Sequence, residues 1–160
     1  MSRSLTSTLA VGAAAGAAGT TALNAVTYLD MAVRGRPTSD TPEQTVERLS
    51  ALVHVPIPGD GQTRDNRLAG LGPLTGLLTG ISFGVVLAMV GSAGWRPGPA
   101  GEAAAATGLA LLGSNGPMTL LGITDPRTWS AASWVSDIVP HLAYGAVTAA
   151  VLRGLTASSA

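Results

Sequence analysis

The sequence has no cysteine, and all nine of its basic residues are arginines. Without cysteine the chain cannot form disulfides, thiolate metal sites or a cysteine nucleophile. Charged residues make up only 11% of the 160 residues, against about 25% in an average soluble domain. The formal net charge is zero, which argues against nucleic acid as a partner, because proteins that bind it carry an excess of positive charge. The length is that of a single domain.

Four long apolar runs predict an all-α polytopic membrane protein, a bundle of four transmembrane helices forming one membrane domain over residues 1–160. Each run reaches the roughly 20 residues that a helix needs to cross a hydrocarbon core about 30 Å thick. Backbone groups cannot stay unsatisfied in lipid, so runs of this length must be helical. All three tryptophans lie near the ends of runs, where aromatic residues gather at membrane surfaces. The predicted spans are residues 5–33, 68–93, 103–123 and 131–155.

The first run also has features of a cleavable signal peptide. It follows a short start with one positive charge and contains alanines at the A-x-A spacing of a cleavage site. The run is longer than the roughly 7–15 apolar residues of a signal peptide, so we favour a retained span.

The distribution of arginine predicts how the spans are oriented. Six arginines fall in the loops 34–67 and 124–130, and three fall on the opposite face. Cytoplasmic loops of membrane proteins carry the excess of Arg and Lys. We therefore expect a multi-pass protein of the cell membrane with the long loop in the cytoplasm and both termini extracytoplasmic.

The long loop contains a predicted amphipathic helix over about residues 42–54. Thr41 as N-cap, Pro42 at the first helical position and Gln44 two residues later form the pattern of a capping box. The helix could lie on the membrane surface or cover the bundle as a lid. Residues 56–67 are rich in turn formers and are predicted to be irregular, and His54 is predicted to be solvated. The expected apolar face comprises Val46, Leu49 and Val53.

Small residues recur at every fourth position of the second span. Such a stripe lets another helix backbone approach closely, and close packing then replaces the hydrophobic drive that is absent in lipid. The first span carries a related stripe that begins with Gly12 and Gly16 and continues to the polar Asn24 and Tyr28. We expect the small parts of the two stripes to pack together, within one chain or between copies. The second stripe comprises Gly72, Gly76, Gly80 and Gly84.

Polar residues within the spans concentrate in the half that is predicted to be cytoplasmic. At 1.5 Å per residue, three of them lie roughly 12–15 Å inside span ends that share this face. Pro117 is expected to kink or break the third span, and Pro140 to bend the fourth. The predicted polar layer comprises Asn24, Tyr28, Asn115, Asp137, His141 and Tyr144.

Asp137 and His141 carry the sharpest functional hypothesis. They are four residues apart on one helix and can interact directly. An ionisable group inside a membrane points to a functional site. Polar side chains also act as hydrogen-bonding links between helices, so a purely structural role for the layer stays open.

Signatures of enzymes are missing from the sequence, which contains no G-x-S-x-G, H-E-x-x-H or P-loop motif. One histidine and one aspartate within the spans are too few ligands for a closed metal site. We therefore expect no enzyme activity, no metal and no cofactor. The expected function is that of a structural or accessory subunit, with the lipid bilayer and a homo-oligomer or larger membrane complex as partners. The alternative is a small proton-responsive transporter, channel or ligand-binding protein that uses Asp137 and His141.

Two segments of the chain read TTALNAVTYLDMAVRGRPTSDTPEQTVERL and NRLAGLGPLTG. They resemble segments of small, uncharacterised four-span membrane proteins from high-GC actinobacteria. The resemblance covers most of the first two spans and the loop between them. It implies a four-span membrane protein but no activity, and it identifies no functional residue.

Overall fold

The computed structural model describes residues 4–157, and these residues form helices and connecting loops without any strand. The predicted all-α class is therefore confirmed for this part of the chain. Three helices in the described part of the chain, α1, α3 and α5, are long and apolar enough to cross a membrane, and α4 is not among them. The elements are α1 (Leu5–Arg34), α2 (Thr41–Leu52), α3 (Gly61–Ser92), α4 (Pro99–Leu120), the 3₁₀ turn η1 (Pro126–Thr128) and α5 (Ala131–Ala157).

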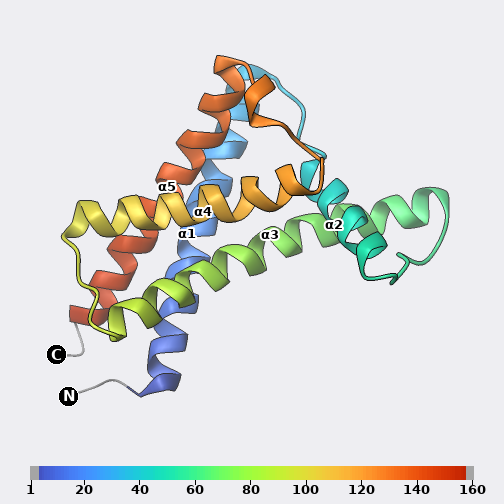
Figure 1. The fold of residues 1–160 in the computed structure, drawn as a ribbon. Coiled ribbons are helices and arrows are strands. Elements are labelled where there is room, and N and C mark those ends of the chain that lie inside the picture. The colour runs from blue at the N-terminus through green and yellow to red at the C-terminus, as the bar shows by residue number, and fades with distance from the viewer. Residues whose placement is uncertain (1–3, 158–160) are drawn as a thin grey trace.

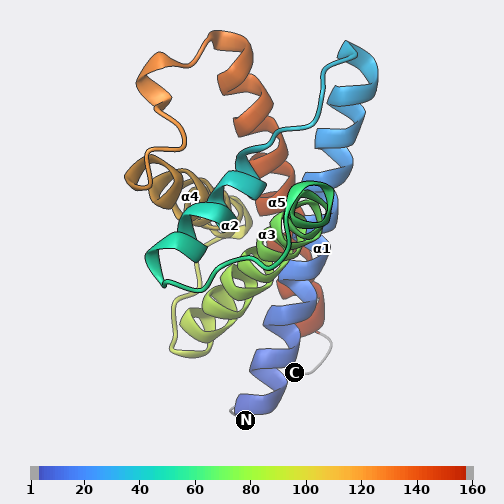
Figure 2. The same ribbon diagram turned by 90° about the vertical axis from the view of Figure 1, so that its right-hand side faces the viewer.

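The four long helices are arranged as one antiparallel pair, α1 and α5, which the other two helices cross. Helices α1 and α5 run antiparallel, so that the start of α1 and the end of α5 lie at the same end of the molecule (Figures 1 and 2). Helices α3 and α4 cross this pair obliquely (Figure 1). Helix α1 packs extensively on α3 and on α5, and α4 packs on α5, while α3 and α4 barely touch each other. The arrangement therefore differs from a bundle of four aligned helices.

Glycines allow α1 and α3 to cross at close range. A Cβ on Gly16 would lie 2.5 Å from the carbonyl oxygen of Gly80, and one on Gly12 would lie 2.6 Å from the Cα of Val85. A Cβ on Gly84 would collide with the backbone of both Gly12 and Gly16. The small parts of the two stripes thus face each other within one chain.

The rest of the stripe on α3 has other surroundings. Gly72 packs against Pro42 at the start of α2, whereas a Cβ added to Gly76 would have no other atom within 4 Å. A four-residue repeat drifts around a helix of 3.6 residues per turn, so an oblique crossing meets only part of such a stripe.

Helix α5 completes the packing with small residues of its own. Gly145 lies so close to α4 that a Cβ there would be 2.6 Å from the carbonyl oxygen of Ala103. Gly19 of α1 packs against Tyr144 and Thr148 of α5, both fully buried. The contact between α5 and its neighbours is therefore as close as that between α1 and α3.

The boundaries of α2 differ from the prediction. Asp40 is the N-cap, and no side chain caps the helix. The predicted capping box does not form, since Thr41 is the first residue of the helix and not its N-cap. The Oγ of Ser39 accepts from the Thr41 backbone N–H at 3.2 Å and lies 2.7 Å from the Thr41 hydroxyl. The helix ends at Leu52, and the exposed His54 takes a left-handed conformation with φ 56°.

The prediction of an irregular segment before the second span was wrong for its second half. Helix α3 begins at Gly61, seven residues before the predicted span. Side chains of its first turns contact neighbouring parts of the chain: Arg64 forms an ion pair of 2.5 Å with Glu47 of α2, and Arg67 donates to the carbonyl oxygen of Pro58. The polar residues of this segment therefore form the first turns of α3, which are exposed, and not an irregular loop.

Of the two outcomes predicted at Pro117, a kink or a break, the break does not occur, since α4 continues through this residue to Leu120. Proline removes only one backbone donor, and this one lies near the C-terminal end of the helix, where little helical structure follows. Nearby hydroxyls bond the helix backbone: Ser114 donates to the carbonyl of Ala110 at 2.7 Å, and Thr119 to that of Asn115 at 2.7 Å. Polar groups of this kind help helices in membranes to tolerate proline.

Candidate functional site: a polar cluster between α4 and α5

Four polar side chains meet where α4 packs on α5. We call Ser114 and Asn115 of α4 together with Asp137 and His141 of α5 the α4–α5 cluster. The Nδ2 of Asn115 donates to Oδ2 of Asp137 at 2.8 Å, and Nε2 of His141 lies 3.2 Å from Oγ of Ser114. The cluster therefore links the two helices through two separate side-chain contacts.

The hydrogen bonds of His141 are compatible with both the neutral and the charged ring. Nδ1 lies 2.7 Å from the carbonyl oxygen of Asp137, so this nitrogen carries a proton and donates it. In the neutral ring, Nε2 then accepts from the hydroxyl of Ser114. In the charged ring, Nε2 donates to Ser114, whose own hydrogen bonds the carbonyl of Ala110 at 2.7 Å. A rotation of one hydroxyl is enough to accommodate either state.

The cluster is largely shielded from solvent. The side chains of His141 and Asp137 are 12% and 18% exposed, and Oδ1 of Asp137 lies 3.6 Å from Nδ1 of His141. The Oδ1 of Asn115 is buried and has no hydrogen-bond partner. Buried polar atoms without a hydrogen-bond partner are uncommon in proteins.

Tyr144 was predicted to belong to the same layer, but it lies at the crossing of α1, α3 and α5. Its hydroxyl donates to the carbonyl oxygen of Gly80 at 2.7 Å, and its ring packs beside Gly19. The residue is 1% exposed. Tyr144 therefore joins three helices and lies outside the α4–α5 cluster.

The two polar residues of α1 also lie outside the cluster. Tyr28 is 60% exposed and does not face the interior, and Asn24 is half-buried. Within residues 4–157, no hydrogen bond connects either of them to the cluster. The last turns of α1 extend beyond its crossing with α3 (Figure 1), where the Arg34 guanidinium donates to Ser136 of α5 at 2.8 Å. Equal depth along the helices therefore did not place Asn24 and Tyr28 beside the cluster.

The sequence-based layer missed Ser114 as a partner of His141 and missed the buried Thr148. Both have a recognisable signal. Ser114 directly precedes Asn115, and Thr148 continues the spacing of Asp137, His141 and Tyr144 along one side of α5. A search for helix-facing polar residues at this spacing would have found Thr148.

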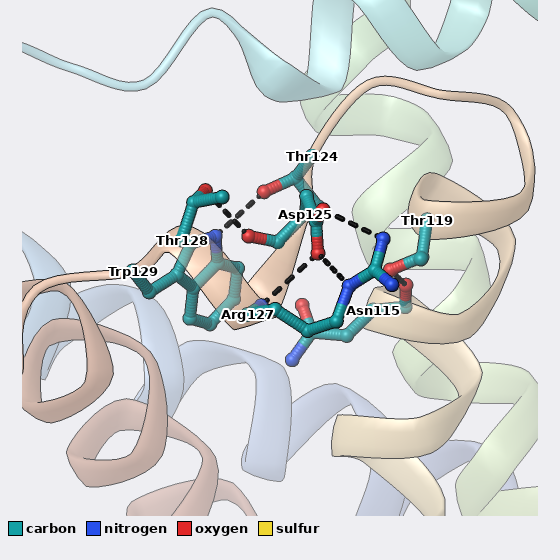
Figure 3. Close-up of polar contacts among 7 residues, drawn as sticks. All are labelled: Asn115, Thr119, Thr124, Asp125, Arg127, Thr128 and Trp129. Atoms are coloured by element: carbon teal, nitrogen blue, oxygen red, sulfur yellow. Dashed lines mark hydrogen bonds and ion pairs between the residues drawn. The ribbon is translucent and has the colours of Figure 1, made fainter.

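The loop between α4 and α5 is ordered by its own polar contacts (Figure 3). Asp125 accepts from the backbone N–H of Arg127 at 3.1 Å and from its guanidinium at 2.9 Å. The hydrogen bond and charge of Arg127 lower the pKa of the Asp125 carboxyl. The Trp129 indole donates to the Thr124 hydroxyl at 2.7 Å, and its ring meets that of Trp134 edge-on with centroids 5.0 Å apart. These contacts fix the path of the chain between the end of α4 and the start of α5.

No group of three or more potential metal-ligating side chains (His, Cys, Asp or Glu) occurs among residues 4–157. Comparisons of the chain with protein-family models, with curated proteins and with solved structures find no match.

The two tyrosines of the chain provide a matched test of the helix crossing. We expect Tyr144→Phe to lower the free energy of unfolding by about 0.5–1.5 kcal/mol, because the buried bond to Gly80 is lost. Tyr28→Phe should have no effect, since its ring is exposed. Unfolding of both purified variants in mixed detergent micelles measures the difference. Equal stability of the two variants would contradict the assigned role of the Tyr144 hydroxyl.

Proposed function

We propose that this chain is a multi-pass protein of the cell membrane and that α1, α3, α4 and α5 are its four spans. The length and apolar character of three of these helices support the proposal. The 22 residues of α4 correspond to about 33 Å, which is sufficient for a hydrocarbon core of about 30 Å. Many large apolar side chains point outward where lipid would contact them, among them Leu74, Leu78, Leu112, Val139 and Leu142.

The orientation proposed from the arginines agrees with how the helix ends group together. Arg34 at the end of α1 bonds Ser136 near the start of α5. At the other end, Arg153 of α5 forms an ion pair of 2.7 Å with Glu102 of α4. We place the first group, with α2, in the cytoplasm, and the second group, with both termini, outside the cell.

We propose further that the role of the protein in the membrane is structural or accessory rather than catalytic. The observation that carries this proposal is that the buried or partly buried polar side chains Tyr144, Asn115 and His141 form hydrogen bonds between helices. Tyr144 bonds Gly80, and the α4–α5 cluster pairs its side chains internally. The apolar surface of α3 is mostly left uncovered by the rest of the chain. Lipid, a second copy or another membrane protein would contact that surface.

Mild detergent extraction followed by mass measurement and identification of co-purifying proteins tests this role. We expect a discrete assembly, either a homo-oligomer or a complex with other membrane proteins. A stable monomer that co-purifies with no protein would contradict an accessory role.

The α4–α5 cluster supports a second candidate function, which is a response to protons. His141 can hold its second proton through rotation of the Ser114 hydroxyl, and the carboxylate of Asp137 lies nearby. In liposomes subjected to a pH jump, such a protein should conduct protons, and His141→Ala should reduce the flux at least tenfold. Asn24→Ala, a polar change on α1 outside the cluster, serves as the control. Background-level flux in the wild type and in both variants would exclude this candidate.

A further inference from the structure

Helix α2 and the C-terminal end of α4 form an open groove on the proposed cytoplasmic face. The groove holds about 320 Å³ and is lined by Arg48, Ala51, Leu52, Leu120 and Leu121. Both views show α2 beside this end of α4 (Figures 1 and 2). Two parts of the chain that are distant in sequence therefore create one surface.

Contacts with α3 hold α2 in place and leave Arg48 free. Pro42 packs on Gly72, and Glu47 forms an ion pair with Arg64. Arg48, the next residue, is exposed on the groove side of the helix. Among residues 4–157, Arg48 and Arg96 are the two arginines whose side chains make neither an ion pair nor a hydrogen bond. Of these two, only Arg48 lines the groove.

The groove combines this positive charge with exposed apolar side chains. Leu120 is 89% exposed and Leu52 is 62% exposed, which is costly for leucines in contact with water. The groove lies close to the end of a proposed span, and Trp129 and Trp134 mark the start of the next span. Tryptophans gather at the level of the lipid headgroups. The leucines would then reach the acyl chains while the guanidinium remains at the headgroups.

We propose that this groove binds one anionic phospholipid of the inner leaflet. The guanidinium of Arg48 pairs with the lipid phosphate, which a planar, permanently charged group recognises well. Leu52, Leu120 and Leu121 contact the upper part of the acyl chains. The site rests on the proposed insertion of the chain in the membrane. In this proposal the function of α2 is to hold one lipid at the cytoplasmic ends of α3 and α4.

The test compares the lipid retained by three forms of the full chain. Wild type, Arg48→Gln and Arg96→Gln are purified in detergent with equal amounts of phosphatidylglycerol and phosphatidylcholine, and bound lipid is counted by native mass spectrometry. We expect the wild type and Arg96→Gln to retain phosphatidylglycerol preferentially. Arg48→Gln should lose about fivefold in this preference, the effect of about one basic residue at an anionic surface. Leu120→Ser, a change at an exposed position, should weaken retention of both lipids.

Three results would overturn the lipid site. One is an unchanged preference in Arg48→Gln, and another is an equal loss in Arg96→Gln, which would indicate a general effect of charge. The third is a dimer that disappears in Arg48→Gln, because a second copy would then occupy the groove. Alkaline carbonate extraction separates this question from that of insertion. A wild-type chain released by carbonate contradicts both proposals, whereas a retained chain with any of the three results contradicts the lipid site alone.

Discussion

Gly84→Ala is expected to destabilise the protein by about 1–3 kcal/mol, the cost of adding a methyl group to a fully packed contact. The new Cβ would lie 2.6 Å from the Cα of Gly16 and 2.5 Å from its nitrogen, as well as against the carbonyl of Gly12. All three are backbone atoms, which cannot rotate away. Helices α1 and α3 would have to separate.

Gly76→Ala provides the matched control on the same helix and in the same stripe. No atom lies within 4 Å of its Cβ position, so the substitution should stabilise α3 by about 0.5–1 kcal/mol through its lower backbone entropy when unfolded. Unfolding of both variants by increasing denaturing detergent measures the two effects. Changes of the same sign and size would show that α1 and α3 do not cross at Gly84.

Asn115 and Asp137 are expected to stabilise each other by about 0.6–1.7 kcal/mol, which spans the average and the largest value measured for hydrogen bonds between membrane helices. Their bond of 2.8 Å connects α4 to α5, and both side chains are partly buried. Asn115→Ala, Asp137→Ala and the double variant form a double-mutant cycle that isolates this energy.

The control cycle combines Asn115→Ala with Asn24→Ala, because no hydrogen bond joins these residues in the described part of the chain. We expect additive effects in the control and a clear coupling between Asn115 and Asp137. Additivity in both cycles would mean that the α4–α5 cluster contributes nothing to the packing of its two helices. The outcome also bears on the proton-responsive candidate, since a cluster that does not hold its geometry cannot hold a proton in a defined place.

The lengths of the apolar runs predicted the positions of the long helices well. A helix that is buried in lipid or in a core needs a long apolar run, whichever residues it contacts. The start of α3 could not be predicted in this way, since its first turns are polar and lie outside the apolar run, and Arg64 there forms an ion pair with Glu47 of another helix. The effect of Pro117 was overestimated because α4 ends only three residues later. Local rules thus failed where a distant contact or a nearby helix end determined the result.

The candidate site was predictable only in part. Asn115, Asp137 and His141 were singled out by their polarity inside apolar runs, and the structure brings these three together. Tyr28 and Tyr144 share that polarity but lie elsewhere, because the helices cross obliquely and equal depth along a helix does not mean proximity. The sequence similarly could not tell Gly76 from Gly84, since the crossing point alone distinguishes them.

Labelling of single cysteines tests the central claim, four membrane spans, most directly, and the chain has no cysteine of its own to interfere. Thr38→Cys, Ala93→Cys and Thr128→Cys place one thiol in each of the three loops between long helices, at exposed positions. With a membrane-impermeant maleimide on intact cells, we predict labelling at Ala93→Cys only, and labelling of all three after permeabilisation. If Ala93→Cys and Thr128→Cys react from the same side, α4 does not cross the membrane and the four-span account is wrong.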